Sequence, residues 1–348
     1  MPSQLTPLID WFNAVIAGST VWSAIGLAAA IALGLFLAWK CLQGLALATR
    51  MIRTSLASRK RRSTQGFGIA VAPIIGPKGG QQTKAIIDAL SAHLGLFVFG
   101  TPVEIVRAPR MRVKGAKGFR ASAITYLERS STDLVLWGSR RPGKGQPSSV
   151  EILSCGGSLA PADAMHLEGF FPEISAANEH TTSRVTAYLV ARALQPGLAD
   201  GSAFKAEKLA PVADILLECL DDQDALPERT ALTLETDYAS MALHIGGEGH
   251  LKRVADLRRK RLSSETQLVP AHALQARIDL GRALLGLSEI HFDPVRVREA
   301  MDHLKVAVDL LKAEPVLQLA QATNHAVQKG QAMLGNRKRF SVTSGSTL

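Results

Sequence analysis

The sequence predicts an α/β plus all-α protein with one transmembrane helix near its amino terminus, a small α/β layer domain and a carboxy-terminal solenoid of helical hairpins. Three patterns lead to this prediction: an uncharged apolar run at 21–39, alternating strand and helix patterns over 66–158, and helical periodicity over 178–335. The 348 residues suffice for two modest domains. The apolar fraction of 47% supports folded cores, whereas 5% aromatic residues is sparse for an all-β protein.

Charge is unevenly distributed along the chain, whose formal net charge is +10. The segment 40–62 has seven basic residues and no acidic one, 66–158 has 12 basic against 5 acidic residues, and 159–336 has 18 against 24. Two segments of opposite net charge that follow a basic segment indicate separate domains. The three cysteines are far apart and lack CxxC spacing, so we expect a reducing compartment and neither a zinc site nor a disulfide framework.

The run 21–39, VWSAIGLAAAIALGLFLAW, contains no charged residue. At about 1.5 Å per residue a helix of this run spans roughly 28 Å, close to the hydrocarbon thickness of a bilayer. Positive flanks stay in the cytoplasm, and here they follow the run, so 1–20 is predicted to be a short extracytoplasmic tail. We therefore expect a single-pass inner-membrane protein with its folded domains in the cytoplasm. A buried core helix is the alternative.

The juxtamembrane segment 40–65 carries the cations that set this orientation and that we expect to contact anionic inner-membrane lipid. They are Lys40, Arg50, Arg53, Arg59, Lys60, Arg61 and Arg62. Apolar residues recur among them at near-helical spacing, which is typical of a helix lying along the inner leaflet. A plain stop-transfer flank explains the same charges equally well.

The α/β domain is expected over 66–158, because strand and helix patterns alternate there. Strands or extended segments are predicted at 69–75, 96–99, 103–106, 133–138 and 150–153, and helices at 83–94 and 119–129. The first helix has one apolar face and is followed by Gly95, a good helix terminator.

The turn GPKGGQQT at 76–83 joins the first predicted strand to the first helix. It lacks the order of a phosphate loop, because Lys78 precedes the last two glycines, and it lacks GxGxxG spacing. Backbone N–H groups at such a turn can still meet an anion. The candidate ligands of a nucleotide or other anion are Lys78, Gly79, Gly80, Gln81, Gln82 and Thr83. A structural corner is the preferred interpretation.

Three segments of this domain, IAVAPI at 69–74, DALSAHLGLF at 88–97 and TDLVLWG at 132–138, resemble the TolB amino-terminal-like domain. The resemblance covers about 66–157. That domain occurs in many bacterial proteins, often before tetratricopeptide repeats. The resemblance implies a role in interaction or assembly and supplies no catalytic residues.

Basic residues also cluster at 107–120 and 140–144 within this domain. Nucleic-acid binding is not expected, because the clusters lack interleaved aromatic residues for base stacking. Attraction to anionic lipid and simple solvated loops remain the alternatives.

A linker is predicted at 159–177, and helices follow it. They are expected at 184–194, 205–220, 227–245, 250–262, 271–287, 295–312 and 316–334, before a disordered tail at 336–348. The segments 237–246 (DYASMALHIG) and 279–288 (DLGRALLGLS) align at an offset of about 42 residues. This pattern resembles degenerate tetratricopeptide (TPR) repeats, which implies a groove for a protein partner. An unspecialised helical bundle is the alternative.

Small residues in the second copy, among them Gly281 and Gly286, are predicted to let helices approach closely. The basic run 258–261 is expected to lie on a solvated helix face. No HExxH or comparable spacing predicts a metal site, and no catalytic motif or cofactor fingerprint is present.

The predicted function is therefore a non-enzymatic, membrane-anchored cytoplasmic scaffold that recruits a protein partner through its helices. The alternative is a membrane-tethered sensor that binds a nucleotide or other anion at the glycine turn. Homo-oligomerisation is compatible with either function.

Overall fold

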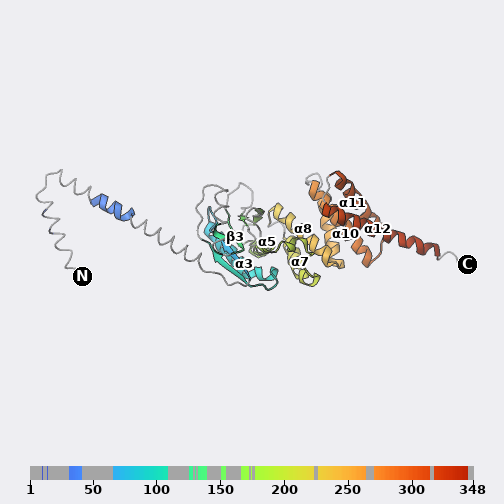
Figure 1. The fold of residues 1–348 in the computed structure, drawn as a ribbon, viewed down its shortest axis with the longest axis horizontal. Coiled ribbons are helices and arrows are strands. Elements are labelled where there is room, and N and C mark those ends of the chain that lie inside the picture. Colours follow the sequence, from blue (N-terminus) through green and yellow to red (C-terminus); the bar gives the residue numbers. More distant parts are fainter. Residues whose placement is uncertain are drawn as a thin grey trace. The chain divides into compact units, whose positions relative to one another are not determined.

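The computed structural model of the chain describes residues 10, 14, 31–40, 66–108, 125–127, 130, 132–138, 150–153, 166–171, 174, 177–222, 226–263, 270–313 and 317–343. The chain forms two compact units, Met1–Arg61 and Arg62–Leu348. The second unit contains the sheet and the helices labelled α3 and α5 to α12 (Figure 1). The segments 66–158 and 178–335 both lie within this second unit.

A five-stranded sheet in the order β2-β1-β3-β4-β5 begins this unit. Its strands are β1 (Phe67–Val71), β2 (Val103–Arg107), β3 (Leu134–Leu136), β4 (Val150–Leu153) and β5 (His166–Phe171). The strands β2, β1 and β3 are parallel, whereas β4 and β5 pair antiparallel. β5 falls within the segment 159–177 that we expected to be a linker.

The helix α3 (Gly79–Phe97) packs its apolar face into the core with Ile86, Leu90 and Leu94. The segment 96–99 was predicted to be extended, and this prediction is wrong for its first half. Phe97 continues the buried face one turn beyond Leu94 and is fully buried, so the helix extends to that residue. Gly95 does not end the helix.

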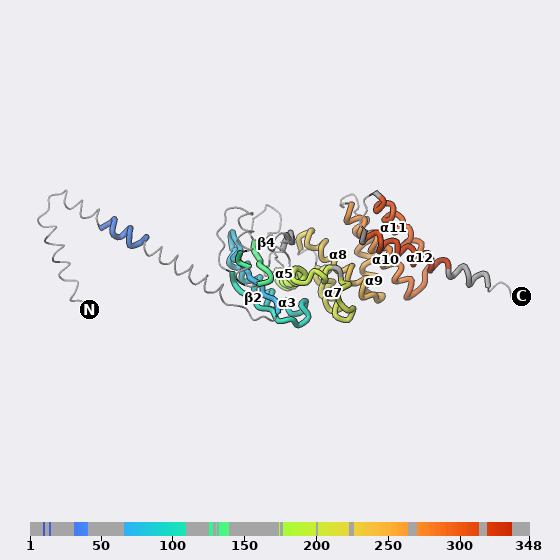
Figure 2. Tube along the Cα trace, in the orientation of Figure 1, coloured from blue at the N-terminus to red at the C-terminus, as the bar shows by residue number. Residues whose placement is uncertain are grey.

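The described elements after β5 are helices, and they follow one another along the chain from α5 to α12 (Figure 2). They are α5 (Glu179–Leu194), α6 (Gly197–Asp200), α7 (Ala206–Asp221), α8 (Glu228–Ile245), α9 (Glu248–Ser263), α10 (Pro270–Ile290), α11 (Pro294–Ala313) and α12 (Leu317–Thr343). The backbone of α12 continues as helix to Thr343, into the tail that we predicted to be disordered.

The predicted fold class is wrong in two respects. The structure is mostly helical, with a small sheet in which three strands are parallel, rather than an α/β domain followed by a separate solenoid. The second respect is the transmembrane helix. Of the run 21–39, residues 21–30 lie outside the described part of the chain, and the described helix there covers 31–40.

Among the described residues, none of the helices combines the length and the apolar character that crossing a membrane requires. This finding contradicts the predicted transmembrane helix and the predicted single-pass localisation in the inner membrane.

One hydrophobic core connects the sheet to the helices. It runs from Ile69 in β1 and Leu134 in β3 to Val297 in α11. Tyr188 on α5 links its parts: the fully buried ring lies edge-on to Phe97 at 5.6 Å between centroids, and the hydroxyl donates a hydrogen bond of 2.9 Å to Asp237 on α8. Continuous burial across α5 explains why the sheet and the helices form one unit.

We expect the free energy of unfolding to fall as pH rises from about 9 to 12. Burial, the largest cause, raises the pKa of Tyr238 from 10.0 to about 12 and that of the Cys219 thiol from 9.0 to about 11. Both groups stay neutral in the folded chain and ionise more readily when it unfolds. Their stabilising contribution is therefore complete below pH 9 and is lost above it.

Urea unfolding at a series of pH values would measure this effect. Tyr238→Phe should reduce the loss of stability between pH 10 and 12, and Cys219→Ala should reduce it between pH 9 and 11. Unchanged pH profiles in both variants would contradict the prediction.

Candidate functional site

The glycine turn before α3 is held together by its own polar side chains. The Thr83 hydroxyl accepts a hydrogen bond of 3.0 Å from the Ile74 N–H and donates one of 2.7 Å to the Gly79 carbonyl. The buried Gln82 side chain bonds both the carbonyl and the N–H of Ile174. The side chains of two candidate anion ligands, Gln82 and Thr83, are thus already hydrogen-bonded to backbone groups of the protein.

Of the other four candidates at this turn, Gly79 is packed against neighbouring backbone and the remaining three are exposed. Gly79 is buried, and a Cβ there would lie 2.2 Å from the Ile74 carbonyl oxygen. Lys78 adopts a left-handed backbone with φ 56°, and it is exposed together with Gly80 and Gln81. The arrangement forms a tight corner with exposed residues on its outer side.

Most of the predicted lipid-contacting cations lie outside the described part of the chain. Only Lys40 is described: it is exposed, and its Nζ lies 5.6 Å from the centroid of the Phe36 ring. Of the basic clusters at 107–120 and 140–144, Arg107 is described, as the exposed last residue of β2.

The basic run 258–261 does not lie wholly on a solvated face, which corrects our expectation. Arg258 is 3% exposed and donates a 2.8 Å hydrogen bond to Asp279, whose side chain is also 3% exposed. Arg261 binds both carboxylate oxygens of the buried Glu235, at 2.7 and 2.8 Å. These two arginines of α9 pair with buried carboxylates on α8 and α10, whereas Arg259 remains exposed.

Buried aspartates mark the two aligned segments of the predicted repeat. Asp237 on α8 and Asp279 on α10 are each 2% exposed, and each binds an arginine from another helix. The partner of Asp237 is Arg192 on α5, and that of Asp279 is Arg258 on α9. Equivalent positions thus perform equivalent roles, and this agreement is compatible with a helical-repeat-like architecture.

Close helix packing at small residues is confirmed. A Cβ at Gly281 would lie 2.6 Å from Leu304 on α11, and one at Gly286 would lie 2.9 Å from Leu251 on α9. Besides these two helices, α10 also contacts α8 and α12. The alternate helices α8, α10 and α12 therefore lie next to one another along one side of the stack.

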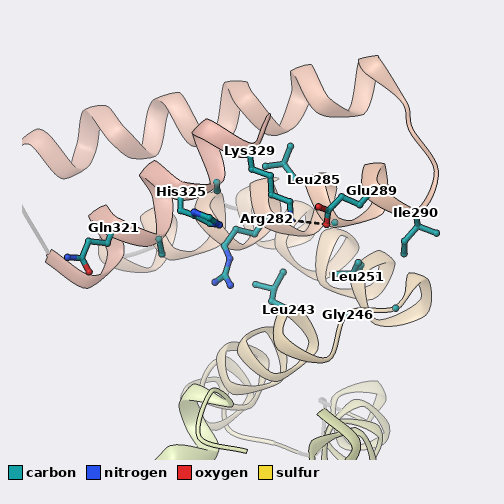
Figure 3. A pocket seen from close by; sticks show the side chains of 14 residues that line it. Leu243, Gly246, Leu251, Arg282, Leu285, Glu289, Ile290, Gln321, His325 and Lys329 are labelled. Atoms are coloured by element: carbon teal, nitrogen blue, oxygen red, sulfur yellow. Dashed lines mark ion pairs between the residues drawn. The ribbon is translucent and has the colours of Figure 1, made fainter. Parts of the chain in front are cut away.

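An open groove of about 640 Å³ lies along these alternate helices (Figure 3). Its lining comes from the end of α8 and the following turn, the start of α9, the second half of α10 and the middle of α12. The residues are Leu243, Gly246, Gly247, Leu251, Arg282, Leu285, Gly286, Glu289, Ile290, Gln321, Ala322, His325, Ala326 and Lys329. We call this feature the groove.

The groove combines apolar side chains with a few polar ones. Leu251 and Leu285 are buried, whereas Ile290 is 44% exposed. Lys329 forms an ion pair of 2.8 Å with Glu289. Arg282 extends into the open space, away from that pair (Figure 3).

The role of these polar residues was not predicted from the sequence, because the small residues around them indicated only close helix packing. One signal was available. Arg282 and Glu289 are seven residues apart and therefore share one face of α10, and Gly286 lies on the same stretch. Which residues α12 would contribute could not be read from this spacing.

The chemistry of the groove is suited to binding. None of its described lining residues carries a hydroxyl or thiol that could act as a nucleophile. Among the described residues, no cluster of three or more histidine, cysteine, aspartate or glutamate side chains could hold a metal ion.

No family model, curated protein or solved structure matches this chain.

Proposed function

We propose that this chain is a non-enzymatic adaptor that binds an extended segment of a partner protein in the groove. The observation that carries the proposal is the groove itself, which runs across three alternate helices and presents both apolar and charged side chains. Stacked helical hairpins commonly use such extended surfaces to bind other proteins. In this proposal α8 to α12 are TPR-like hairpins.

The exposure of the lining residues favours a polypeptide over a small molecule. Arg282, Glu289, Ile290, Gln321 and His325 are all exposed, so the groove is open along its length. Small-molecule sites usually enclose most of the ligand surface. An extended segment can instead contact one side of the groove and leave its other side in solvent.

In this proposal, the TolB-like sheet domain supports the helices that form the groove. The shared core through α5 holds the sheet and the helices together. The alternative of an anion sensor at the glycine turn lacks comparable support, because the Thr83 hydroxyl bonds within the turn and the Gln82 amide bonds the backbone of Ile174.

Panning of a phage-displayed library of random linear peptides on the immobilised full chain tests this function. We expect peptides whose affinity, measured by fluorescence anisotropy, falls at least about tenfold in Ile290→Lys. Ile290 lines the groove and is 44% exposed, so the substitution blocks an apolar contact without disturbing the core.

Val295→Lys is the matched control, because Val295 is 66% exposed on α11 and lies outside the groove lining. It should leave the affinity unchanged. If no peptide is enriched, or if the two variants weaken binding equally, the proposed function is wrong.

A further inference from the structure

The groove contains one cation that the fold does not use. Arg282 on α10 is exposed and makes no ion pair or hydrogen bond with any described residue. Other arginines on α9 and α5, such as Arg258 and Arg192, are paired with carboxylates on neighbouring helices. Arg282 therefore differs from them in having its guanidinium available to a ligand.

A second cation of the groove is already neutralised. Lys329 on α12 lies 2.8 Å from Glu289 on α10, so this pair closes one part of the groove without leaving net charge. Figure 3 shows the guanidinium of Arg282 directed away from the pair. Arg282 is thus the unpaired cation of the described lining, and Gln321 and His325 are its further polar residues.

Apolar residues complete the lining. Leu243, Leu251 and Leu285 come from three different helices, and Ile290 is exposed at the end of α10. A ligand that matches this surface needs a carboxylate for Arg282 and aliphatic side chains for Leu243 and Ile290, which are more accessible than Leu251 and Leu285. The guanidinium fork is suited to two parallel hydrogen bonds with a carboxylate.

We propose that the groove selects acidic segments of its partner protein, in which an aspartate or glutamate binds Arg282 and neighbouring aliphatic residues contact Leu243 and Ile290. This inference rests on the proposed function, because it specifies the chemistry of the same groove. A polyanion such as nucleic acid is a poorer match, because Lys329 is paired with Glu289 and Arg282 is the one unpaired lysine or arginine of the described lining. The described lining also has no phenylalanine, tyrosine or tryptophan side chain for base stacking.

The test uses peptides obtained by panning random linear peptides on the full chain. We expect the enriched peptides to share an aspartate or glutamate beside aliphatic residues. Arg282→Gln should weaken their binding by about tenfold, because it removes a charge-assisted hydrogen bond that the bound peptide partly shields from water. Arg282→Lys should retain part of the affinity, since it keeps the charge and loses the fork.

Arg298→Gln is the matched control, since Arg298 is an exposed arginine on α11 that does not line the groove. It removes the same charge from the chain and should leave binding unchanged. Panning on Arg282→Glu should enrich lysine- or arginine-containing peptides instead, because the sign of the free charge is reversed.

The outcomes separate this inference from the proposed function. Peptides that are weakened by Ile290→Lys but lack acidic residues, and that bind Arg282→Gln normally, would overturn the acidic selectivity and leave the groove as a binding site. The absence of any groove-dependent peptide would overturn both proposals.

Discussion

Replacing Arg258 with alanine is expected to lower the free energy of unfolding by about 3–5 kcal/mol, because it leaves a buried carboxylate without its cation. Asp279 and Arg258 are both 3% exposed and lie 2.8 Å apart between α9 and α10. Gln275 donates to the other carboxylate oxygen at 2.8 Å, but it cannot neutralise the charge. Urea unfolding of the full chain, followed by far-ultraviolet circular dichroism, measures the loss.

The adjacent arginine provides the control for this prediction. Arg259 binds Glu299 at 2.9 Å, but the two side chains are 45% and 38% exposed. Exposed ion pairs contribute little, so Arg259→Ala should cost less than about 1 kcal/mol. The double variant Arg258→Met with Asp279→Leu should recover most of the lost stability, because no buried charge remains. Equal losses in the two single variants would contradict this interpretation of the pair.

Replacing Gly79 with alanine is expected to destabilise the chain by about 3 kcal/mol, because the added methyl group collides with backbone. A Cβ at this position would lie 2.2 Å from the carbonyl oxygen of Ile74 and 3.0 Å from its carbonyl carbon. Relief requires the turn to open, which stretches the 3.0 Å hydrogen bond between the Ile74 N–H and Thr83. The same urea titration measures the effect.

Gly80→Ala is the control one residue further along α3. A Cβ at Gly80 would meet no atom within 4 Å, and alanine is the better helix former. This variant should therefore be as stable as the wild type or more stable, by up to about 1 kcal/mol. If Gly79→Ala unfolds at the same urea concentration as Gly80→Ala, the turn is not as tightly packed as the structure indicates.

Helices with one apolar face were predictable from the sequence, because burial repeats every three to four residues in them. The segments predicted at 227–245 and 295–312 agree closely with α8 and α11. Helix ends were less predictable. The end of α3 depends on the burial of Phe97 against Tyr188, which is distant in sequence. β5 was missed because its strand pairing with β4 is a tertiary contact.

Charged residues were the main source of error. Exposed and buried arginines look alike in a sequence, and Arg258 is buried only because Asp279 comes from the next helix. The lining of the groove could not be predicted for a similar reason, since its residues come from four helices. The apolar run 21–39 predicted a spanning helix, but none of the described helices combines the length and the apolar character that crossing a membrane requires.

Photocrosslinking tests the proposed binding site most directly. A peptide enriched on the full chain would carry a photoreactive side chain, and mass spectrometry would identify the residues to which it becomes attached. We predict attachment within 243–251, 282–290 and 321–329, the segments that line the groove. Attachment within the sheet at 67–71 or 103–107, with none in the groove, would contradict the proposal that the groove binds a partner protein.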